Sequence, residues 1–301
     1  MTMQTGNFSR VIAPGYRKVF FEYLKKRETE YDKVLNVETS SRAYEDEFKM
    51  AGVGLLVSKG EGQSVTYSDP IQGGTKRYTH TTLGLGYRIT QEMYEDDLYQ
   101  VTGSKMAKSL SRSVANRCEV DGWSVLNNAF STSYIGFTAS ESLCSTSHTM
   151  INGDTQANRP TTDTDFSVSS LQAAVESFEA VEDERSIPAM LKPKVVVVSP
   201  SFKWAAREVL MSEYRPYSSD NEINSLKDED LKFMVSHYLT DSDSWFLLAA
   251  KDEHDLKYFW RRKPAFENSD DFDSGDSKFK VTKRTSYGYS DWRGVYGSTG
   301  A

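Results

Sequence analysis

The sequence predicts an α+β fold, in which helices and antiparallel strands occupy different stretches of the chain. Two stretches carry the apolar spacing of amphipathic helices, and others alternate apolar and polar residues as half-buried strands do. A further stretch combines helices with unbroken apolar runs, which is typical of strands buried on both faces. No pattern recurs every ~20–50 residues, and this excludes solenoids and propellers.

The composition excludes several classes of protein. The 301 residues hold 36 Lys and Arg against 43 Asp and Glu, a net charge of −7, whereas a free-standing DNA-binding domain normally has a high pI. No run of ~18 apolar residues occurs, and residues 1–10 lack the apolar segment of a signal peptide, so we expect no membrane partner. Cys118 and Cys144 are too few for a disulfide framework and indicate free thiols in a reducing cytoplasm.

The N-terminal part of the chain predicts an amphipathic helix over residues 13–35. One helical stripe is apolar and consists of Tyr16, Val19, Phe20, Tyr23 and Leu24. Basic residues lie mostly off this stripe, namely Arg17, Lys18, Lys25, Lys26 and Arg27. The helix can pack on its own core with a solvated basic face, dock on a neighbouring subunit, or face nucleic acid, and the pattern leaves these alternatives open.

Residues 48–90 predict a long β-hairpin. Apolar residues alternate at both ends of this stretch, in Val53, Leu55 and Val57 and again in Leu83, Leu85, Tyr87 and Ile89. The polar, glycine-bearing residues between them form no clear core, and an isolated hairpin is only marginally stable in water. We therefore expect the hairpin to lie on the surface of another molecule.

Residues 91–130 carry a helical pattern without proline. A continuous helix of that length would span about 60 Å and act as a spine for other elements, and a break near Gly122 is the alternative. Residues 131–166 are rich in Ser, Thr, Asn and Gly, and we expect a long loop there.

The next part of the chain predicts a compact α/β unit over residues 167–252. A helix begins at Ser167, and a strand over Val195–Val198 lies between two prolines. A helix over residues 201–212 and a second buried strand over 246–250 complete this unit. The last fifty residues alternate again, which predicts antiparallel strands that close the fold.

The sequence offers few residues for chemistry. Cys144 and His148 could form a nucleophile and its base, or two metal ligands, but a metal site needs three or four ligands. The acidic stretch Asp270–Asp276 does not have EF-hand spacing and predicts a solvated hairpin tip. The basic and aromatic stretch Tyr258–Lys263 could stack on single-stranded nucleic acid, but packed cation–π pairs or subunit contacts are commoner uses of such residues. We predict no catalytic, cofactor-binding or metal-binding residue.

The order of these parts resembles the major capsid protein of tailed bacteriophages, which has the Hong Kong 97 fold, and especially its Mu-like head-subunit branch. Four local signatures carry the resemblance: Leu143, His148, Gly153 and Asn158 in LCSTSHTMINGDTQAN; VVVVSP leading into FKWAAREVL; Asn221-x-Ile223-Asn224 followed by DSDSWFLLAA; and the ending from Arg284 through SYGYSDWRGVYG. The resemblance covers nearly the whole chain.

The resemblance implies a division of the chain into five segments. They are an N-terminal arm (1–47), an extended β-hairpin loop (48–90), a peripheral domain with the spine helix and its following loop (91–166), an α/β axial domain (167–252) and closing strands of the peripheral domain (253–301). Some relatives join a hairpin lysine to an asparagine. Lys59 and Lys76 lie in the corresponding element, but no catalytic acid is identified beside them, so we predict no crosslink.

The resemblance also implies a function and partners. Copies of the chain would assemble as pentamers and hexamers into the icosahedral shell of a virion, made in the host cytoplasm and enclosing double-stranded DNA. The implied partners are a scaffolding protein, a portal, a decoration protein and the packaged DNA, with no enzymatic activity and no cofactor. A non-viral nanocompartment shell shares the fold and is one alternative, and a small hydrolase that uses Cys144 is another.

Two sets of residues are the candidates for this function. Apolar residues of the arm and hairpin are candidates for contacts between subunits, and they are Tyr16, Phe20, Tyr23, Val53, Leu55, Val57, Val65 and Tyr67. Basic residues of the arm are candidates for nonspecific contact with DNA phosphates, and they are Arg17, Lys18, Lys25, Lys26 and Arg27.

Overall fold

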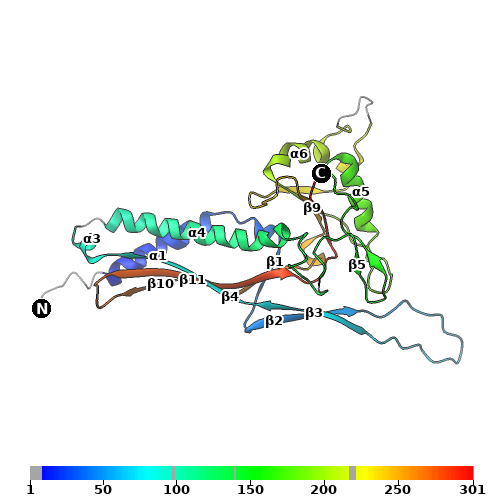
Figure 1. Cartoon of the computed structure of the whole chain (residues 1–301), viewed down its shortest axis with the longest axis horizontal. Coiled ribbons are helices and arrows are strands. Elements are labelled where there is room, and N and C mark those ends of the chain that lie inside the picture. Colours follow the sequence, from blue (N-terminus) through cyan, green and yellow to red (C-terminus); the bar gives the residue numbers. More distant parts are fainter. Residues whose placement is uncertain (1–8, 97–98, 139, 217–221, 301) are drawn as a thin grey trace. The chain divides into compact units, whose positions relative to one another are not determined.

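A computed structural model of the chain describes residues 9–96, 99–138, 140–216 and 222–300 (Figure 1). Contacts divide the chain into two compact units. The first unit consists of Met1–Glu45, Thr79–Gly122 and Tyr258–Tyr287, and the second consists of Asp46–Tyr78, Trp123–Lys257 and Gly288–Ala301. Asn221, which belongs to one of the sequence signatures, lies outside the described residues.

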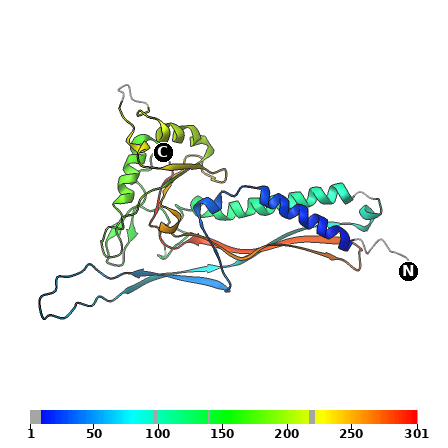
Figure 2. The same ribbon diagram turned by 180° about the vertical axis from the view of Figure 1, so that it is seen from behind.

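Helices α1 (Ser9–Lys26) and α4 (Tyr99–Asn127) lie side by side on one face of a sheet in the first unit (Figure 2). Two short helices, α2 (Tyr31–Val34) and α3 (Gln91–Glu95), accompany them. The helix predicted over 13–35 therefore ends at Lys26, and the pattern over 91–130 forms the two helices α3 and α4 instead of one. The predicted spine helix continues through Gly122 without a break. Glycine is needed there for close packing, because a Cβ at this position would lie 2.6 Å from the Cβ of Tyr31 in α2.

The sheet of the first unit has the order β1-β10-β11-β4. Its strands are β1 (Asn36–Thr39), β4 (Thr81–Ile89), β10 (Leu256–Asp270) and β11 (Ser277–Tyr289). β4 pairs with β11 in antiparallel register, from Ser277 opposite Ile89 to Thr285 opposite Thr81. The expected hairpin over 48–90 is therefore wrong in its second arm. Alternation in residues 83–89 identified a strand, but it carries no information about which strand is the partner.

The hairpin is instead formed by β2 (Tyr44–Ala51) and β3 (Ile71–Thr79), which pair in a two-stranded sheet. Residues 52–70, which we call the loop tip, join the two strands and contain no helix or strand. Figure 1 draws the loop tip as a long open loop beyond the ends of β2 and β3. The alternation of Val53, Leu55 and Val57 therefore belongs to extended chain without a pairing strand.

The second unit also contains an α/β lobe, whose sheet has the order β12-β9-β7-β8. Its strands are β7 (Val195–Val198), β8 (Lys232–Val235), β9 (Trp245–Leu248) and β12 (Val295–Ser298). β8 is parallel to β7, whereas β9 is antiparallel to β7 and to β12. The pairing of the last strand with this sheet was not predicted, because residues 253–301 were assigned to the other domain.

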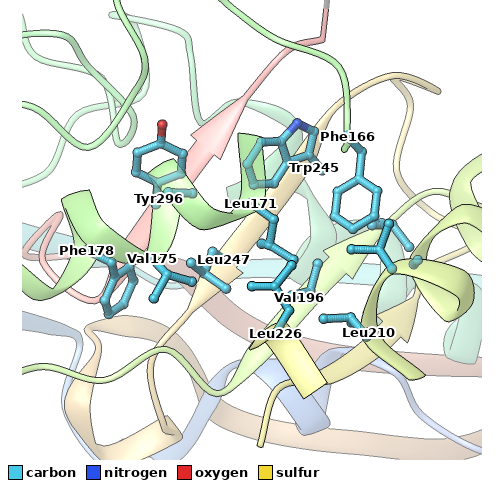
Figure 3. Packing of buried hydrophobic residues seen from close by; sticks show 14 of the residues in the cluster. Phe166, Leu171, Val175, Phe178, Val196, Leu210, Leu226, Trp245, Leu247 and Tyr296 are labelled. Atoms are coloured by element: carbon cyan, nitrogen blue, oxygen red, sulfur yellow. The ribbon is translucent and has the colours of Figure 1, made fainter. Parts of the chain in front are cut away.

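Helices α5 (Val168–Glu179) and α6 (Lys203–Met211) pack on the lobe sheet and bury the hydrophobic core of the lobe (Figure 3). The helix predicted to begin at Ser167 is α5, and Ser167 is its N-cap, because its hydroxyl accepts a hydrogen bond from the N–H of Ser170. Leu171, Val196 and Trp245 are fully buried in this core.

Residues 131–166 are the predicted long loop, interrupted by the short pair β5 (His148–Thr149) and β6 (Thr155–Gln156). This loop belongs to the second unit with the lobe, whereas the sequence grouped it with the spine helix. In the part of the chain that the structure describes, turns of 3-10 helix occur at η2 (Pro200–Phe202), η3 (Ser225–Lys227) and η4 (Lys251–Glu253). None of the described helices is long and apolar enough to cross a membrane.

Candidate assembly surface

The loop tip exposes a concentration of apolar side chains. All five tip residues named from the sequence are exposed, and they are Val53, Leu55, Val57, Val65 and Tyr67. Leu56 is fully exposed as well, and sequence reasoning missed it because the alternating pattern placed it on the polar side. The unbroken run Leu55-Leu56-Val57 was the signal that could have found it. Contiguous exposed apolar surface of this kind marks a site of interaction with another molecule.

The strand that leads into the tip is anchored to the lobe by a buried ion pair. The Lys49 Nζ lies 2.6 Å from Glu184 Oε1, and the Arg293 guanidinium lies 2.7 Å from the same oxygen. The other carboxylate oxygen accepts a hydrogen bond of 2.7 Å from the N–H of Ile151. Burial acts to raise the pKa of Glu184, but the contacts with Lys49, Ile151 and Arg293 outweigh it and lower that pKa. Glu184 is therefore held as a carboxylate.

A single arginine connects both ends of the loop tip. Arg185 Nε donates to the carbonyl oxygen of Gly52 at 2.6 Å, and its Nη2 donates to the carbonyl oxygen of Asp69 at 2.7 Å. The planar guanidinium fork suits two acceptors at once, which a lysine cannot match. Arg185 therefore binds both chains of the loop tip at the place where they leave the paired strands β2 and β3.

Further ion pairs hold the base of the hairpin. Arg77 makes two hydrogen bonds of 2.7 Å to the carboxylate of Asp46, and they lower the pKa of that exposed group. Lys257 Nζ lies 2.6 Å from Glu47 Oε1 on the neighbouring position of β2. The base is therefore held by polar contacts on both faces of the strand.

β3 also approaches the 131–166 loop closely. The Lys76 ammonium donates to the carbonyl oxygen of Ile135, and burial lowers the pKa of this lysine. A Cβ on Gly74 would lie 2.1 Å from the carbonyl oxygen of Phe137, so only glycine permits this approach. These contacts fix the middle of β3 and leave the loop tip outside them.

A groove of about 570 Å³ lies beside the base of the hairpin. Residues 46–52 of the hairpin line it together with residues of the lobe and its connections. The charged lining residues are six acids and three bases, and they are Asp46, Glu47, Asp183, Glu184, Asp255, Asp291, Lys49, Lys257 and Arg293. Burial raises the pKa of Asp255, and the charges of Asp291 and Glu47 add to this effect against that of Lys257. The hairpin base is thus bordered by a groove whose lining combines these charges with apolar residues, among them Phe48, Met50 and Phe137.

The α1 residues divide into two groups that the sequence did not separate. Tyr16 and Phe20 are buried within the first unit, where their rings contact Phe279 and Phe266. Their assignment as subunit contacts is therefore corrected. The apolar stripe of α1 packs on β10 and β11 of its own unit, so these two side chains are not free to contact another subunit. Tyr23 is partly exposed, and the ammonium of Lys108 lies 5.0 Å from the centre of its ring.

The five basic candidates of the arm are all exposed, and they are Arg17, Lys18, Lys25, Lys26 and Arg27. Two of them have polar neighbours within the first unit: Lys18 lies 3.9 Å from Glu22, and Arg27 donates to Asn116 at 2.5 Å. The side of α1 that carries these residues is a positively charged surface of an otherwise acidic chain.

Cys144 and His148 do not form a catalytic pair. The Cys144 side chain is fully buried, and burial raises the pKa of its thiol far above the ordinary value, so the nucleophilic thiolate does not form. His148 is buried, its ring is stacked on Trp292, and its Nε2 lies 2.9 Å from Asn158 Oδ1. Burial lowers the pKa of His148 despite its contacts with Asn158 and Glu141. The alternative of a hydrolase using Cys144 is therefore not supported.

The signature in the 131–166 loop has a structural explanation. The Asn158 side chain donates to the carbonyl oxygens of Leu143 and Val295 and accepts from the N–H of Ser145. Gly153 has a φ of +94°, a backbone conformation that favours glycine. These residues fasten the loop to the last strand of the lobe.

Two further sequence candidates also have structural uses. Tyr258 and Trp260 are buried, with the Lys283 ammonium 5.8 Å from the Trp260 ring, so these aromatic rings are not available to stack on bases. The acidic stretch Asp270–Asp276 lies at the turn between β10 and β11, as predicted. Among the described residues, no group of three or more His, Cys, Asp or Glu side chains could hold a metal ion.

The structure is similar to those of several shell-forming proteins. The capsid protein of the cyanophage P-SCSP1u is 9% identical, with a TM-score of 0.57 over 91% of this chain and 89% of that chain. A chain of the procapsid of bacteriophage JBD30 is 15% identical, with a TM-score of 0.51 over 100% of this chain and 77% of that chain. A virus-like particle from Pyrococcus furiosus is 10% identical, with a TM-score of 0.51 over 94% and 97%. At these identities the likeness shows a common fold, and the predicted Hong Kong 97 fold is confirmed.

Sequence comparison distinguishes between the members of this fold. No curated protein matches the chain in sequence. The model of the family described as phage capsid protein matches residues 73–298, which is well over half of the chain. This match favours a phage shell over a non-viral one, and the Mu-like branch stays a prediction. The chain therefore belongs to the phage capsid protein family and is a major capsid protein, a subunit of the virion shell.

Proposed function

We propose that the loop tip of each copy lies across an adjacent copy and that this contact joins the subunits of the shell. The observation that carries the proposal is the exposure of Leu55, Leu56 and Tyr67, which have no covering layer in their own unit. Burial of about 400 Å² of apolar surface would contribute roughly 10 kcal/mol before the costs of ordering. Repeated on every subunit, such contacts hold a shell together without covalent crosslinks.

The proposal extends to the lattice and its partners. Closed shells repeat near-symmetric contacts of one chain, and we propose an icosahedral lattice of pentamers and hexamers. The segments act as the arm (1–47), extended loop (48–90), peripheral domain (91–166 and 253–301) and axial domain (167–252). Assembly in the host cytoplasm uses a scaffolding protein, a portal and a decoration protein.

We also propose that α1 faces the packaged double-stranded DNA. Its exposed basic residues support this role, because lysine and arginine bind phosphates without sequence preference and release counterions. Binding of this kind weakens as the salt concentration rises. The acidic remainder of the chain keeps other surfaces away from the DNA by repulsion.

The test replaces an apolar residue of the loop tip and measures assembly. The variant Leu56→Asp should fold normally, because the side chain contacts nothing in its own unit, but it should form few or no shells in electron micrographs and light scattering. The matched control is Ser64→Asp, which adds the same charge to another exposed position of the same loop tip. Shells of Leu56→Asp as abundant as those of Ser64→Asp would refute the loop-tip contact.

A further inference from the structure

We propose that a turn of the lobe, residues 182–188, positions the loop tip, with Arg185 as the positioning residue and Glu184 as its second anchor. We call this segment the lobe turn. The inference rests on the proposed function of the loop tip, because the direction of the tip matters only where the tip reaches another copy. It assigns to Arg185 and Glu184 a role in setting the geometry of assembly.

The lobe turn is closed by hydrogen bonds among its own residues. Asp183 Oδ1 accepts hydrogen bonds from the N–H groups of Arg185 at 2.7 Å and Ile187 at 3.0 Å. A bridge between Glu182 and Pro188 closes the turn, and the N–H of Asp183 donates to the carbonyl oxygen of Ile187 at 2.7 Å. A turn closed by its own hydrogen bonds can hold the side chains at its apex in fixed positions.

Arg185 acts at the two points where the tip begins and ends. The β2 strand ends at Ala51 and β3 begins at Ile71, so the ladder of the hairpin does not extend to Gly52 or Asp69. The Arg185 guanidinium binds both carbonyl oxygens there and takes the place of the next pair of the ladder. Beyond this contact, the N–H of Gly54 donates to Ser68 Oγ at 3.4 Å, so loss of Arg185 would remove the contact nearest the last paired residues and leave this weaker one.

Glu184 fixes the adjacent part of β2. Its carboxylate lies between the cations of Lys49 on β2 and Arg293 near the C-terminus; Lys49 and Glu184 are buried, and Arg293 is largely so. The groove beside them is lined by charged and apolar residues together. Polar contacts hold the hairpin at several places, and the contacts that lie nearest the loop tip, from Arg185 and Glu184, come from the lobe turn.

The test measures the direction of the tip in the unassembled protein. Cysteines introduced by Ser64→Cys in the tip and Ala173→Cys on α5 carry spin labels, since both positions are exposed and the native Cys118 and Cys144 are buried. Double electron–electron resonance then gives the distribution of distances between the labels. We expect a narrow distribution in the parent protein and at least a twofold broader one with Arg185→Ala.

Three variants make the outcome specific. Arg207→Ala removes an exposed arginine elsewhere in the lobe and should leave the distribution unchanged. Arg185→Lys should give an intermediate width, because an ammonium can reach one carbonyl oxygen but not both. Glu184→Gln, made with Arg185 intact, should also broaden the distribution of distances. If Glu184→Gln fails to fold, the comparison of the parent protein with Arg185→Ala decides the outcome.

The result separates this inference from the proposed function. A distribution that is equally narrow with Arg185 and with Arg185→Ala overturns the positioning role, and so does a broad distribution in the parent protein. Broadening together with malformed or absent shells supports both proposals. Broadening with normal shells supports the positioning of the tip by Arg185 and overturns the role of the tip in assembly.

Discussion

The lobe and the loop tip use the same apolar residues in opposite ways. In the lobe, the strands Val195–Val198 and Trp245–Leu248 are covered by α5 and α6, and their side chains form a closed core (Figure 3). In the loop tip, Val53, Leu55 and Val57 are exposed. The comparison teaches that apolar residues in this chain mark two kinds of surface, one covered by the chain itself and one that we propose is covered by another copy.

The largest expected effect comes from a matched pair of substitutions in these two regions. Leu171 is fully buried in the lobe, so Leu171→Ala should lower the free energy of unfolding by about 2–5 kcal/mol through lost burial and a cavity. Leu55 is 75% exposed in the tip, and Leu55→Ala should change that free energy by less than about 0.5 kcal/mol. Urea unfolding of the unassembled protein measures both. A cost for Leu55→Ala near that for Leu171→Ala would mean that the tip is buried in its own chain.

A smaller effect on the free energy of unfolding is expected at the ion pair that joins the hairpin strand β2 to the lobe. Glu184→Gln keeps the shape of the side chain but leaves the cations of Lys49 and Arg293 without their anion, so we expect a loss of about 1–3 kcal/mol in unfolding free energy. The control is Glu222→Gln, which breaks the exposed pair with Arg215 and should cost about 0–1 kcal/mol. Equal losses for the two variants would show that burial adds nothing to the Glu184 contacts.

The smallest effect is a dependence of stability on acid that follows from the same carboxylate. The pKa of Glu184 in the folded chain lies below its ordinary value of 4.5, so its contribution to stability is present above that value and is lost as the pH falls through the folded pKa. The unfolding midpoint should therefore fall on acidification below about pH 4.5, and less steeply in Glu184→Gln. Lys49 and Arg293 are the cations that face this group. Identical acid profiles for the parent and the variant would contradict this assignment.

Local patterns predicted most of the secondary structure, because a helix or strand depends on neighbouring residues. The spacing of Tyr16 and Phe20, the cap at Ser167 and the run Val195–Val198 each identified the right element. The same patterns did not predict which strands pair with one another. Residues 83–89 were read as one arm of a hairpin, yet they pair with β11, which lies almost 200 positions further along the chain.

The residues of the candidate site likewise include some that the sequence identified and others that only the structure revealed. Exposed apolar residues such as Leu55 and Tyr67 could be named from the sequence, because the stretch around them offers nothing to cover them. Tyr16 and Phe20 were assigned to the same surface and are buried, because only the folded sheet supplies Phe279 and Phe266 as their neighbours. Arg185 carried no signal at all, since its two acceptors are backbone carbonyl oxygens far away in the chain.

The sequence by itself determined the α+β class, the order of most helices and strands, and the presence of a hairpin that carries apolar residues without a core of its own. Each of these follows from periodicity and turn residues over short distances along the chain. Only the tertiary structure decided which strands pair, which apolar faces are covered, and how the base of the hairpin is held. Those outcomes depend on contacts between residues remote in sequence, and a polar anchor such as Lys49 with Glu184 exists only once the fold has brought its two halves together.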